Sequence, residues 1–235
     1  MATDTAALPD DIRESIAIGD AKSRAGQPPI ADDILTSKTR FFDRWAPTYD
    51  WLLPSVFYQA VHKRLLEYIQ LSEQAHVLDI GCGTGRLLDR LAKRFPHLQG
   101  IGLDLSPEML RQARRNNHYR PRLIFIQGVS HAMPFVENQF EAAFNTISFL
   151  HYPDPQRVLQ EVHRVLQPGG RFYLVDYTLS EWRSGMQQRL FSPIRIRFYS
   201  RQTRERMGTE AGLRCAGHHH LLGPVLLTIF VKAQS

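Results

Sequence analysis

Residues 76–85 read HVLDIGCGTG and decide the fold of this chain. The first five form an apolar run of the length of a buried strand, and Leu87, Leu88 and Leu91 mark one face of a helix over residues 86–95. The glycine-rich turn between them lets the backbone approach a ligand closely and directs the first N–H groups of the helix toward it. We therefore predict a strand–loop–helix unit with a ligand site at its loop.

Short apolar runs and amphipathic segments alternate after this unit. Helices are predicted from Ser106 to Asn116 and from Asp154 to the break at residues 168–170, and strands over 100–103, 123–126, 141–147 and 171–177. Alternation of this kind predicts a parallel sheet covered by helices on both faces. The tail differs, because residues 213–222 and 225–232 are joined at Gly223-Pro224 as a hairpin. The predicted fold class is α/β: a Rossmann-like, doubly wound, mostly parallel seven-stranded sheet with an antiparallel terminal hairpin strand and a helical N-terminal cap.

The chain divides into an N-terminal extension and one domain. Residues 1–37 are predicted to be the extension, and 38–235 the domain, with an aromatic-rich cap at 38–71 and an arginine-rich lid at 183–206. No apolar run approaches the roughly 20 residues that span a bilayer, no secretory signal is recognisable, and two cysteines make no disulfide framework. We expect a cytoplasmic protein.

The positive charge of the chain is concentrated in the predicted lid. The net charge is +6, and residues 183–206 hold seven arginines and one acid, Glu205. Such a segment attracts anionic lipid or nucleic acid, or is simply a solvated helix face. Arginine alternates with apolar residues over 191–199, a pattern typical of an interfacial element, so peripheral membrane contact through 183–206 is one hypothesis.

The glycine loop lacks the features of the common phosphate-binding loops. A dinucleotide fingerprint starting at Gly81 needs its third glycine at position 86, where this chain has Arg86, and no Gly-Lys-Ser/Thr ending is present. Asp79 stands two residues before Gly81, where a carboxylate repels phosphate and suits a cationic ligand. Asp104 follows the second strand, where an acid accepts ribose hydroxyls. A ribose with a cationic, phosphate-free tail describes S-adenosylmethionine; the alternative is that each acid is only a helix N-terminal charge or a loop residue.

Four segments of the chain resemble one known family. They are residues 77–85, 102–110 (GLDLSPEML), 133–135 (MPF) and 164–170 (RVLQPGG), and together they resemble the class I S-adenosylmethionine-dependent methyltransferases of the type 11 group. Residues 42–50 (FDRWAPTYD) and 146–149 (TISF) are similar to segments of the ubiquinone/menaquinone C-methyltransferases within that group. The resemblance spans roughly residues 40–176.

The resemblance implies a set of cofactor-binding residues. Residues 81–85 are expected along the methionine part of the cofactor, Asp104 at the ribose, Ser148 near the transferred methyl group and Tyr49 over the cofactor carboxylate. The full predicted set is Tyr49, Asp79, Gly81, Cys82, Gly83, Thr84, Gly85, Asp104, Leu105, Met109, Val129, Ser130 and Ser148.

This sequence departs from the family pattern at two places. Residues 128–131 read GVSH where relatives usually show Gly-Asp-Ala-Glu, so the acid that often meets the adenine amino group is missing, and backbone groups of Val129 and Ser130 are the candidates to replace it. The second quinone signature has Gln167, Asp176 and Thr178 in place of lysine, glutamate and serine.

His151 is the candidate general base, because it follows the fourth strand and imidazole titrates near neutrality. A base is needed only if the acceptor must lose a proton, and the alternative is that His151 only caps or packs. Asp50, Tyr177 and Arg195 are weaker candidates for substrate contact. Residues 218–220 (HHH) are predicted to be surface, not a metal site, because alternate strand residues point to opposite faces.

The predicted function is methyl transfer from S-adenosylmethionine to a small apolar or aromatic acceptor, with a prenylated quinol as one hypothesis and S-adenosylhomocysteine as the product. Two alternatives remain open. An RNA or tRNA methyltransferase fits the basic segment, although residues 145–149 lack the prolines of base amino-methylating enzymes, and neither Cys82 nor Cys215 is placed for pyrimidine chemistry. The other is a non-catalytic S-adenosylmethionine-binding protein.

Overall fold

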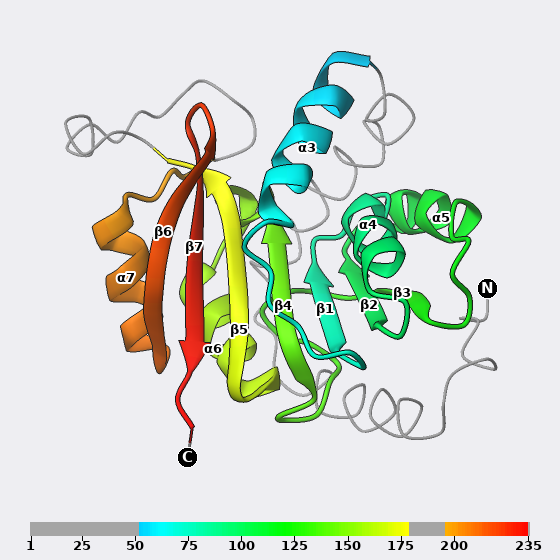
Figure 1. Ribbon diagram of the computed structural model, residues 1–235. Helices are drawn as coiled ribbons and strands as arrows, with labels where there is room; N and C mark the ends of the chain where they lie inside the picture. Colours follow the sequence, from blue (N-terminus) through cyan, green and yellow to red (C-terminus); the bar gives the residue numbers. More distant parts are fainter. Residues whose placement is uncertain (1–51, 179–195, 235) are drawn as a thin grey trace, which may run out of the picture.

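The computed structural model describes residues 52–178 and 196–234. They form a central sheet between two helical layers (Figure 1). The strands are β1 (His76–Ile80), β2 (Gln99–Asp104), β3 (Leu123–Gln127), β4 (Phe140–Thr146), β5 (Leu166–Tyr177), β6 (Leu213–Leu222) and β7 (Val225–Lys232). The helices are α3 (Leu52–Leu65), α4 (Arg86–Arg94), α5 (Pro107–Arg115), α6 (Pro155–Val165) and α7 (Arg201–Glu210), with a 3₁₀ turn, η2, at Phe149–His151.

The sheet has the order β3-β2-β1-β4-β5-β7-β6. Strands β1 to β5 are parallel, and β7 is antiparallel to both β5 and β6. The predicted fold class is therefore confirmed, including the terminal hairpin. The strand order reverses between β1 and β4, and open α/β sheets bind ligands at such a switch point, beyond the carboxyl ends of the strands.

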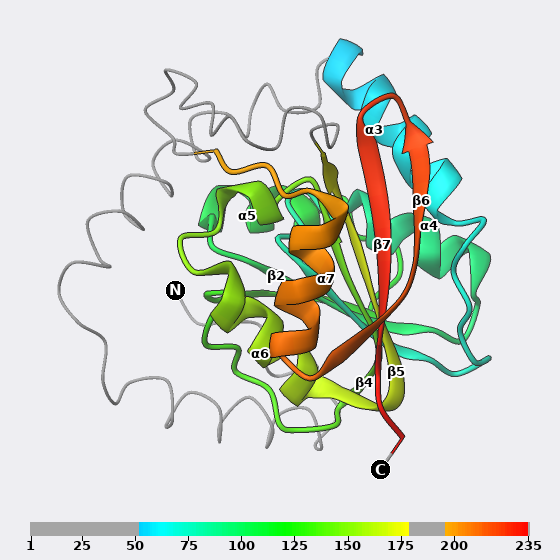
Figure 2. The same cartoon turned by 90° about the vertical axis from the view of Figure 1, so that its left-hand side faces the viewer.

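Each face of the sheet carries its own apolar core. Helices α3, α4 and α5 pack on one face with residues such as Val61, Leu88 and Leu110, and α6 and α7 pack on the other with residues such as Val162 and Met207. Figure 2 shows α6 and α7 on one side of the sheet and α3 and α4 on the other.

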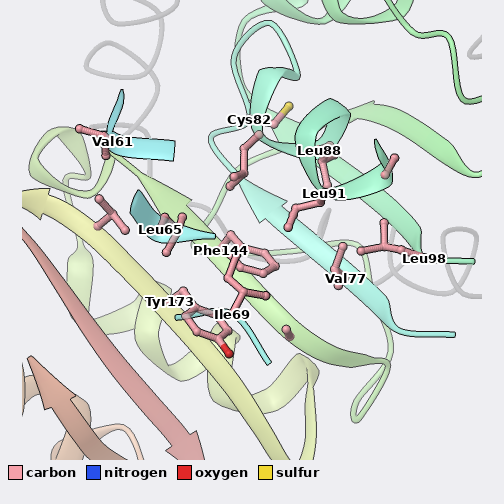
Figure 3. Packing of buried hydrophobic residues seen from close by; sticks show 14 of the residues in the cluster. Val61, Leu65, Ile69, Val77, Cys82, Leu88, Leu91, Leu98, Phe144 and Tyr173 are labelled. Atoms are coloured by element: carbon pink, nitrogen blue, oxygen red, sulfur yellow. The ribbon is translucent and has the colours of Figure 1, made fainter. Parts of the chain in front are cut away.

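Stacked aromatic rings lie at the centre of the α3–α4 layer. Phe144 of β4 and Tyr173 of β5 are fully buried, with ring centroids 5.0 Å apart, beneath Leu65 and Leu91 (Figure 3). Each such buried side chain contributes about 1.5–3 kcal/mol of transfer free energy. This packing holds β4 in the middle of the sheet, and with it the loop that follows β4.

Local signals set the helix ends. Ser106 caps α5, its hydroxyl accepting from the backbone N–H of Met109 at 3.1 Å, and Asp154 caps α6 in the same way. One predicted boundary is wrong: α6 ends at Val165 and β5 begins at Leu166, so residues 166–170 belong to the strand. Leu166 pairs with Phe140 before a register irregularity, and the regular pairing resumes at Arg171.

Several predicted segments lie outside the described residues: the extension 1–37, residues 38–51 of the cap, and residues 183–195 of the arginine-rich lid. Residues 201–206 of that lid form the first part of α7. Within the described ranges, no helix has the length and apolar character needed to cross a membrane.

Candidate active site

A cleft of about 840 Å³, counting the space open to solvent, lies at the carboxyl ends of β1, β2 and β4. Nine residues predicted from the sequence line the cleft: Gly81, Gly83, Asp104, Leu105, Met109, Val129, Ser130, Ser148 and His151. Seven further lining residues were not predicted: Leu103, Gly128, His131, Thr146, Ile147, Tyr152 and Pro153.

The glycine loop takes conformations that other residues rarely adopt. Gly81 and Gly83 have φ values of +71° and +53°. A Cβ atom on Gly81 would collide with Oγ of Ser148 and would lie 2.9 Å from the hydroxyl of Tyr152, whereas one on Gly83 would meet nothing within 4 Å. Gly81 is therefore required by the close approach of the 148–152 turn, while Gly83 faces open space.

Asp104 connects the end of β2 to the glycine loop. Its Oδ2 accepts a hydrogen bond from the backbone N–H of Gly83 at 2.8 Å, and its Oδ1 accepts one from Ser106 at 2.9 Å. A carboxylate offers about four acceptor positions. Asp104 thus both fixes the loop and lines the cleft.

Asp79 is buried at the end of β1, under the loop. It is 1 % exposed, and neither carboxylate oxygen has a hydrogen-bond partner among the described residues. Burial, and after it the negative charge of Asp104, raises the pKa of Asp79 to about 8. A buried carboxyl without a partner is costly to ionise unless a positive charge lies nearby.

Three side chains form a hydrogen-bonded group beside Gly81. The Nδ2 of fully buried Asn145 lies within hydrogen-bond distance of the carbonyl of Ile80 (2.7 Å), Oγ of Ser148 (2.7 Å) and the hydroxyl of Tyr152 (2.8 Å). Burial raises the pKa of the Tyr152 phenol. Asn145, near the end of β4, and Tyr152, in the loop after it, were not predicted as site residues.

Backbone strain marks the same loop. Ile147 has a φ of +52°, which is rare for a β-branched residue, and its N–H donates to the carbonyl of Val175 at 2.8 Å. Strained residues cluster at functional sites, where surrounding contacts hold them in place.

His151 ends the 3₁₀ turn η2 and lines the cleft. Asp176 holds this turn: its Oδ2 accepts from the backbone N–H of Leu150 at 2.8 Å, and its Oδ1 accepts from that of Tyr177 at 2.7 Å. Burial raises the pKa of Asp176 to about 6, against the opposing effect of these hydrogen bonds. The aspartate that departs from the family pattern therefore positions the turn that carries His151.

Residues 128–131 form another part of the cleft wall. Gly128 donates its N–H to the carbonyl of Asp104 at 3.0 Å, and Val129 bridges to Ala132. Val129 and Ser130 line the cleft as predicted, and His131 lines it too. Burial lowers the pKa of His131, which favours its neutral form.

Four predicted cofactor residues do not line the cleft: Asp79, Cys82, Thr84 and Gly85. Cys82 and Thr84 are buried, and a Cβ atom on Gly85 would lie 2.7 Å from the ring of Phe125. These positions therefore pack against the protein interior and not against the cleft. Tyr49, Asp50 and Arg195 lie outside the described residues. The ring of Tyr177 stacks on that of Phe57, with centroids 6.2 Å apart.

The arginine-rich segment needs one correction. Arg204 is 2 % exposed and donates to the carbonyls of Leu226, Asp176 and Tyr177 at 3.0–3.1 Å. It therefore joins α7 to β5 and β7 and adds nothing to a charged surface. Desolvation lowers the pKa of Arg204 to about 10.

The histidine run alternates between faces as predicted. His218 and His220 face α7, where they lie near Glu205 and Arg201 respectively. His219 faces the other way, and its ring lies against that of Tyr68, with centroids 4.4 Å apart. The prediction that the run is merely surface is wrong for His218, whose side chain is only 10 % exposed and lies in a group with Glu205 and Cys215.

Comparisons with known proteins agree with this geometry. Residues 77–170 match a family model described as a methyltransferase domain. The chain is 30% identical over 158 residues to a demethylmenaquinone methyltransferase of Chlorobaculum tepidum, covering 62% of this chain and 64% of that protein. It is 33% identical over 154 residues to an uncharacterised methyltransferase of Synechocystis sp., covering 60% of this chain and 70% of that protein.

The fold has solved counterparts. A SAM-dependent methyltransferase from Aquifex aeolicus aligns with a TM-score of 0.60 at 21% identity, covering 72% of this chain and 88% of that one. The match to the Chlorobaculum protein spans less than two thirds of that protein's length. Because the chain is 33% identical to the Synechocystis methyltransferase and covers 70% of its length, it belongs to the methyltransferase family.

Proposed function

We propose that this chain transfers a methyl group from S-adenosylmethionine to a small apolar or aromatic acceptor, and that the acceptor is a prenylated quinol. The observation that carries the proposal is the glycine loop set between two carboxyls, Asp104 in the cleft wall and Asp79 buried without a partner. The pair suits a ribose joined to a cationic tail. The acceptor class is supported by the similarity to the Chlorobaculum demethylmenaquinone methyltransferase.

The residues present fit this cofactor. Asp104 would accept the ribose hydroxyls, the backbone of Gly81 and Gly83 would border the methionine part, and backbone groups of Val129 and Ser130 would meet the adenine. The carboxyl of Asp79 would ionise when a cation comes near it. When bound, S-adenosylmethionine would supply an electrophilic methyl group, whose carbon the acceptor attacks in line as the carbon–sulfur bond breaks and S-adenosylhomocysteine leaves.

The chain contributes positioning and one proton acceptor. The strained turn at Ile147 and the Asn145–Ser148–Tyr152 hydrogen bonds fix the wall beside Gly81, so a bound acceptor meets a rigid surface. His151, which lines the cleft at the end of the turn that Asp176 caps, would accept the acceptor's proton. Leu105, Met109 and Ile147 give the cleft an apolar lining that suits an aromatic ring.

A prenylated quinol resides in lipid, so peripheral membrane contact through residues 183–206 of a cytoplasmic protein belongs to the same proposal. Arg204 is excluded from that contact by its burial. The remaining arginines of the segment would meet lipid head groups.

Calorimetric titration with S-adenosylmethionine and S-adenosylhomocysteine, followed by transfer assays with radiolabelled methyl donor, tests the proposal. A demethylated naphthoquinol with a short prenyl chain in detergent should be methylated, and tRNA should not. Binding without turnover on any acceptor would favour the non-catalytic alternative. Turnover on tRNA alone would replace the quinol with RNA, and millimolar ligands that fail to bind would overturn the enzyme assignment.

A further inference from the structure

A cluster of metal-binding side chains lies outside the cleft, between α7 and the edge strand β6. Glu205 of α7 and Cys215 and His218 of β6 place one ligand atom each within 4.8 Å of the others. Nε2 of His218 lies 2.8 Å from Oε1 of Glu205 and 3.6 Å from Sγ of Cys215. None of the three lines the cleft. Figures 1 and 2 both show α7 alongside β6 at this end of the sheet.

A bulge in β6 explains why two residues three positions apart share one side. In a regular strand such residues point to opposite faces. Here the pairing with β7 shifts between Cys215, opposite Phe230, and Gly217, opposite Ile229, and the extra residue turns His218 toward the side of Cys215. The next residue, His219, lies against Tyr68 instead.

A second contact orients the imidazole. Nδ1 of His218 lies 3.0 Å from Oγ1 of Thr228, on the neighbouring strand β7. With its proton on Nδ1 and donated to this hydroxyl, His218 presents the lone pair of Nε2 to the space between Glu205 and Cys215. Metal-binding histidines are commonly fixed in this way by a partner on the other ring nitrogen.

We propose that Glu205, Cys215 and His218 bind a divalent transition-metal ion, with zinc the ion that suits this ligand set. A thiolate, an imidazole and a carboxylate are its usual protein ligands, and three of them leave one position for water. Bond lengths of about 2.0–2.3 Å in a tetrahedral site separate neighbouring ligand atoms by about 3.3–3.6 Å. The observed 3.6 Å meets this requirement, and the 2.8 Å pair would open by about half an ångström as the ion enters between Nε2 and Oε1.

The site can adjust to the ion. The side chain of Glu205 is 52 % exposed and free to shift, whereas that of His218 is 10 % exposed and held by Thr228. Cys215 binds as the thiolate, and its proton passes to solvent on binding. Because the ligands come from α7 and β6, the ion fastens the helix to the edge strand. The role is structural.

The test uses the full chain, freed of metal and kept reduced, and titrated with Co²⁺ while its absorption spectrum is recorded. Wild type should develop a thiolate-to-cobalt charge-transfer band in the near ultraviolet together with the visible bands of tetrahedral Co²⁺. Cys215→Ser should lose the charge-transfer band. His219→Ala, a histidine of the same run that faces away, should bind like wild type.

A second measurement does not depend on the cysteine. Zn²⁺ in excess over its dissociation constant should raise the Tm of wild type and His219→Ala by roughly 5 °C or more. Glu205→Gln, which alters an exposed side chain, should weaken Zn²⁺ binding about tenfold or more. If wild type shows neither the charge-transfer band nor a Tm shift, the cluster is only a hydrogen-bonded group. If the charge-transfer band persists in Cys215→Ser, the ion binds at another site. Either result overturns the proposal.

Discussion

The carboxyl of Asp79 is buried close enough to Asp104 for the charge of Asp104 to act on it. Burial contributes the larger part and Asp104 the next, and together they raise the pKa of Asp79 to about 8. Asp104 carries hydrogen bonds from Gly83 and Ser106, while Asp79 has no hydrogen-bond partner among the described residues. The two acids at this loop therefore differ in their surroundings: Asp104 accepts two backbone hydrogen bonds, whereas the raised pKa of Asp79 favours its protonated form until a cation arrives.

This difference predicts how stability depends on pH. The carboxyl of Asp79 has a pKa near 3.9 in the unfolded chain and about 8 in the native one, so the native state binds the proton more tightly. Its contribution to stability is complete below about pH 4 and is lost as pH rises through 8. The ligand-free protein should lose up to roughly 1 kcal/mol per pH unit over that window. Asp79→Asn should flatten the dependence, measured by urea unfolding at several pH values.

Glu67→Gln is the matched control, because Glu67 is exposed and pairs with nearby Arg64. It should keep the wild-type slope. Equal slopes for wild type and Asp79→Asn would mean that Asp79 is ionised in the native protein.

Gly81 and Gly83 provide a matched pair for the loop. Both have positive φ, so alanine at either position strains the backbone by about 1 kcal/mol. At Gly81 the added methyl group also collides with Ser148 and Tyr152, whereas at Gly83 it meets nothing. Gly81→Ala should therefore destabilise the protein by about 1–3 kcal/mol more than Gly83→Ala in chemical denaturation. Equal losses would show that the 148–152 turn does not press on Gly81.

Arg204 should be the most sensitive arginine among the described residues of α7. Arg204→Met leaves the carbonyls of Leu226, Asp176 and Tyr177 without their donor in a buried setting, at a cost of about 3–5 kcal/mol. Arg206 is exposed and pairs with Glu210, so Arg206→Met should change stability by less than about 0.5 kcal/mol. Thermal unfolding of the two variants compares them directly, and a small effect of Arg204→Met would place that side chain at the surface after all.

His151 should affect the rate rather than cofactor binding. If it accepts the acceptor's proton, His151→Gln lowers kcat by about 10²–10⁴-fold while the Kd for S-adenosylhomocysteine changes by less than about threefold. His97, an exposed residue that lies near Glu73, supplies the control variant His97→Gln. Full activity of His151→Gln would limit His151 to packing the cleft wall.

Much of the fold could be predicted from the sequence, because the pattern of apolar residues that become buried defines where the strands and helices lie. The strand at residues 76–80 and the hairpin strands at 213–222 and 225–232 were predicted with their observed bounds, since each is an apolar or alternating run bordered by glycine. The start of β5 was misplaced, because pairing of Leu166 with Phe140 across the sheet overrides the local signal of Pro168-Gly169-Gly170. Helix α7 was read as part of a charged lid, because no local pattern shows that Arg204 turns inward to distant carbonyls.

Some residues of the candidate site could likewise be predicted from the sequence, whereas others could not. The glycine loop and the acids near the carboxyl ends of β1 and β2 are set by their place at strand ends, so Asp104 could be predicted at the cleft. The Asn145–Ser148–Tyr152 group could not, because it depends on the positive φ of Ile147 and on a turn that folds back over Gly81. The Glu205–Cys215–His218 group depends on a bulge and on helix packing, neither of which has a sequence signal.

The central claim is that carboxylates at the sheet edge recognise an adenosyl ligand without phosphate. Its most direct test is the Kd of S-adenosylhomocysteine for Asp104→Ala, measured by calorimetry beside wild type and Glu108→Gln, which alters an acid of α5 that pairs with Arg111. Loss of charge-assisted hydrogen bonds worth about 1.5–3 kcal/mol predicts binding roughly 10- to 150-fold weaker in Asp104→Ala and unchanged in Glu108→Gln. Wild-type affinity in a folded Asp104→Ala protein would contradict the claim.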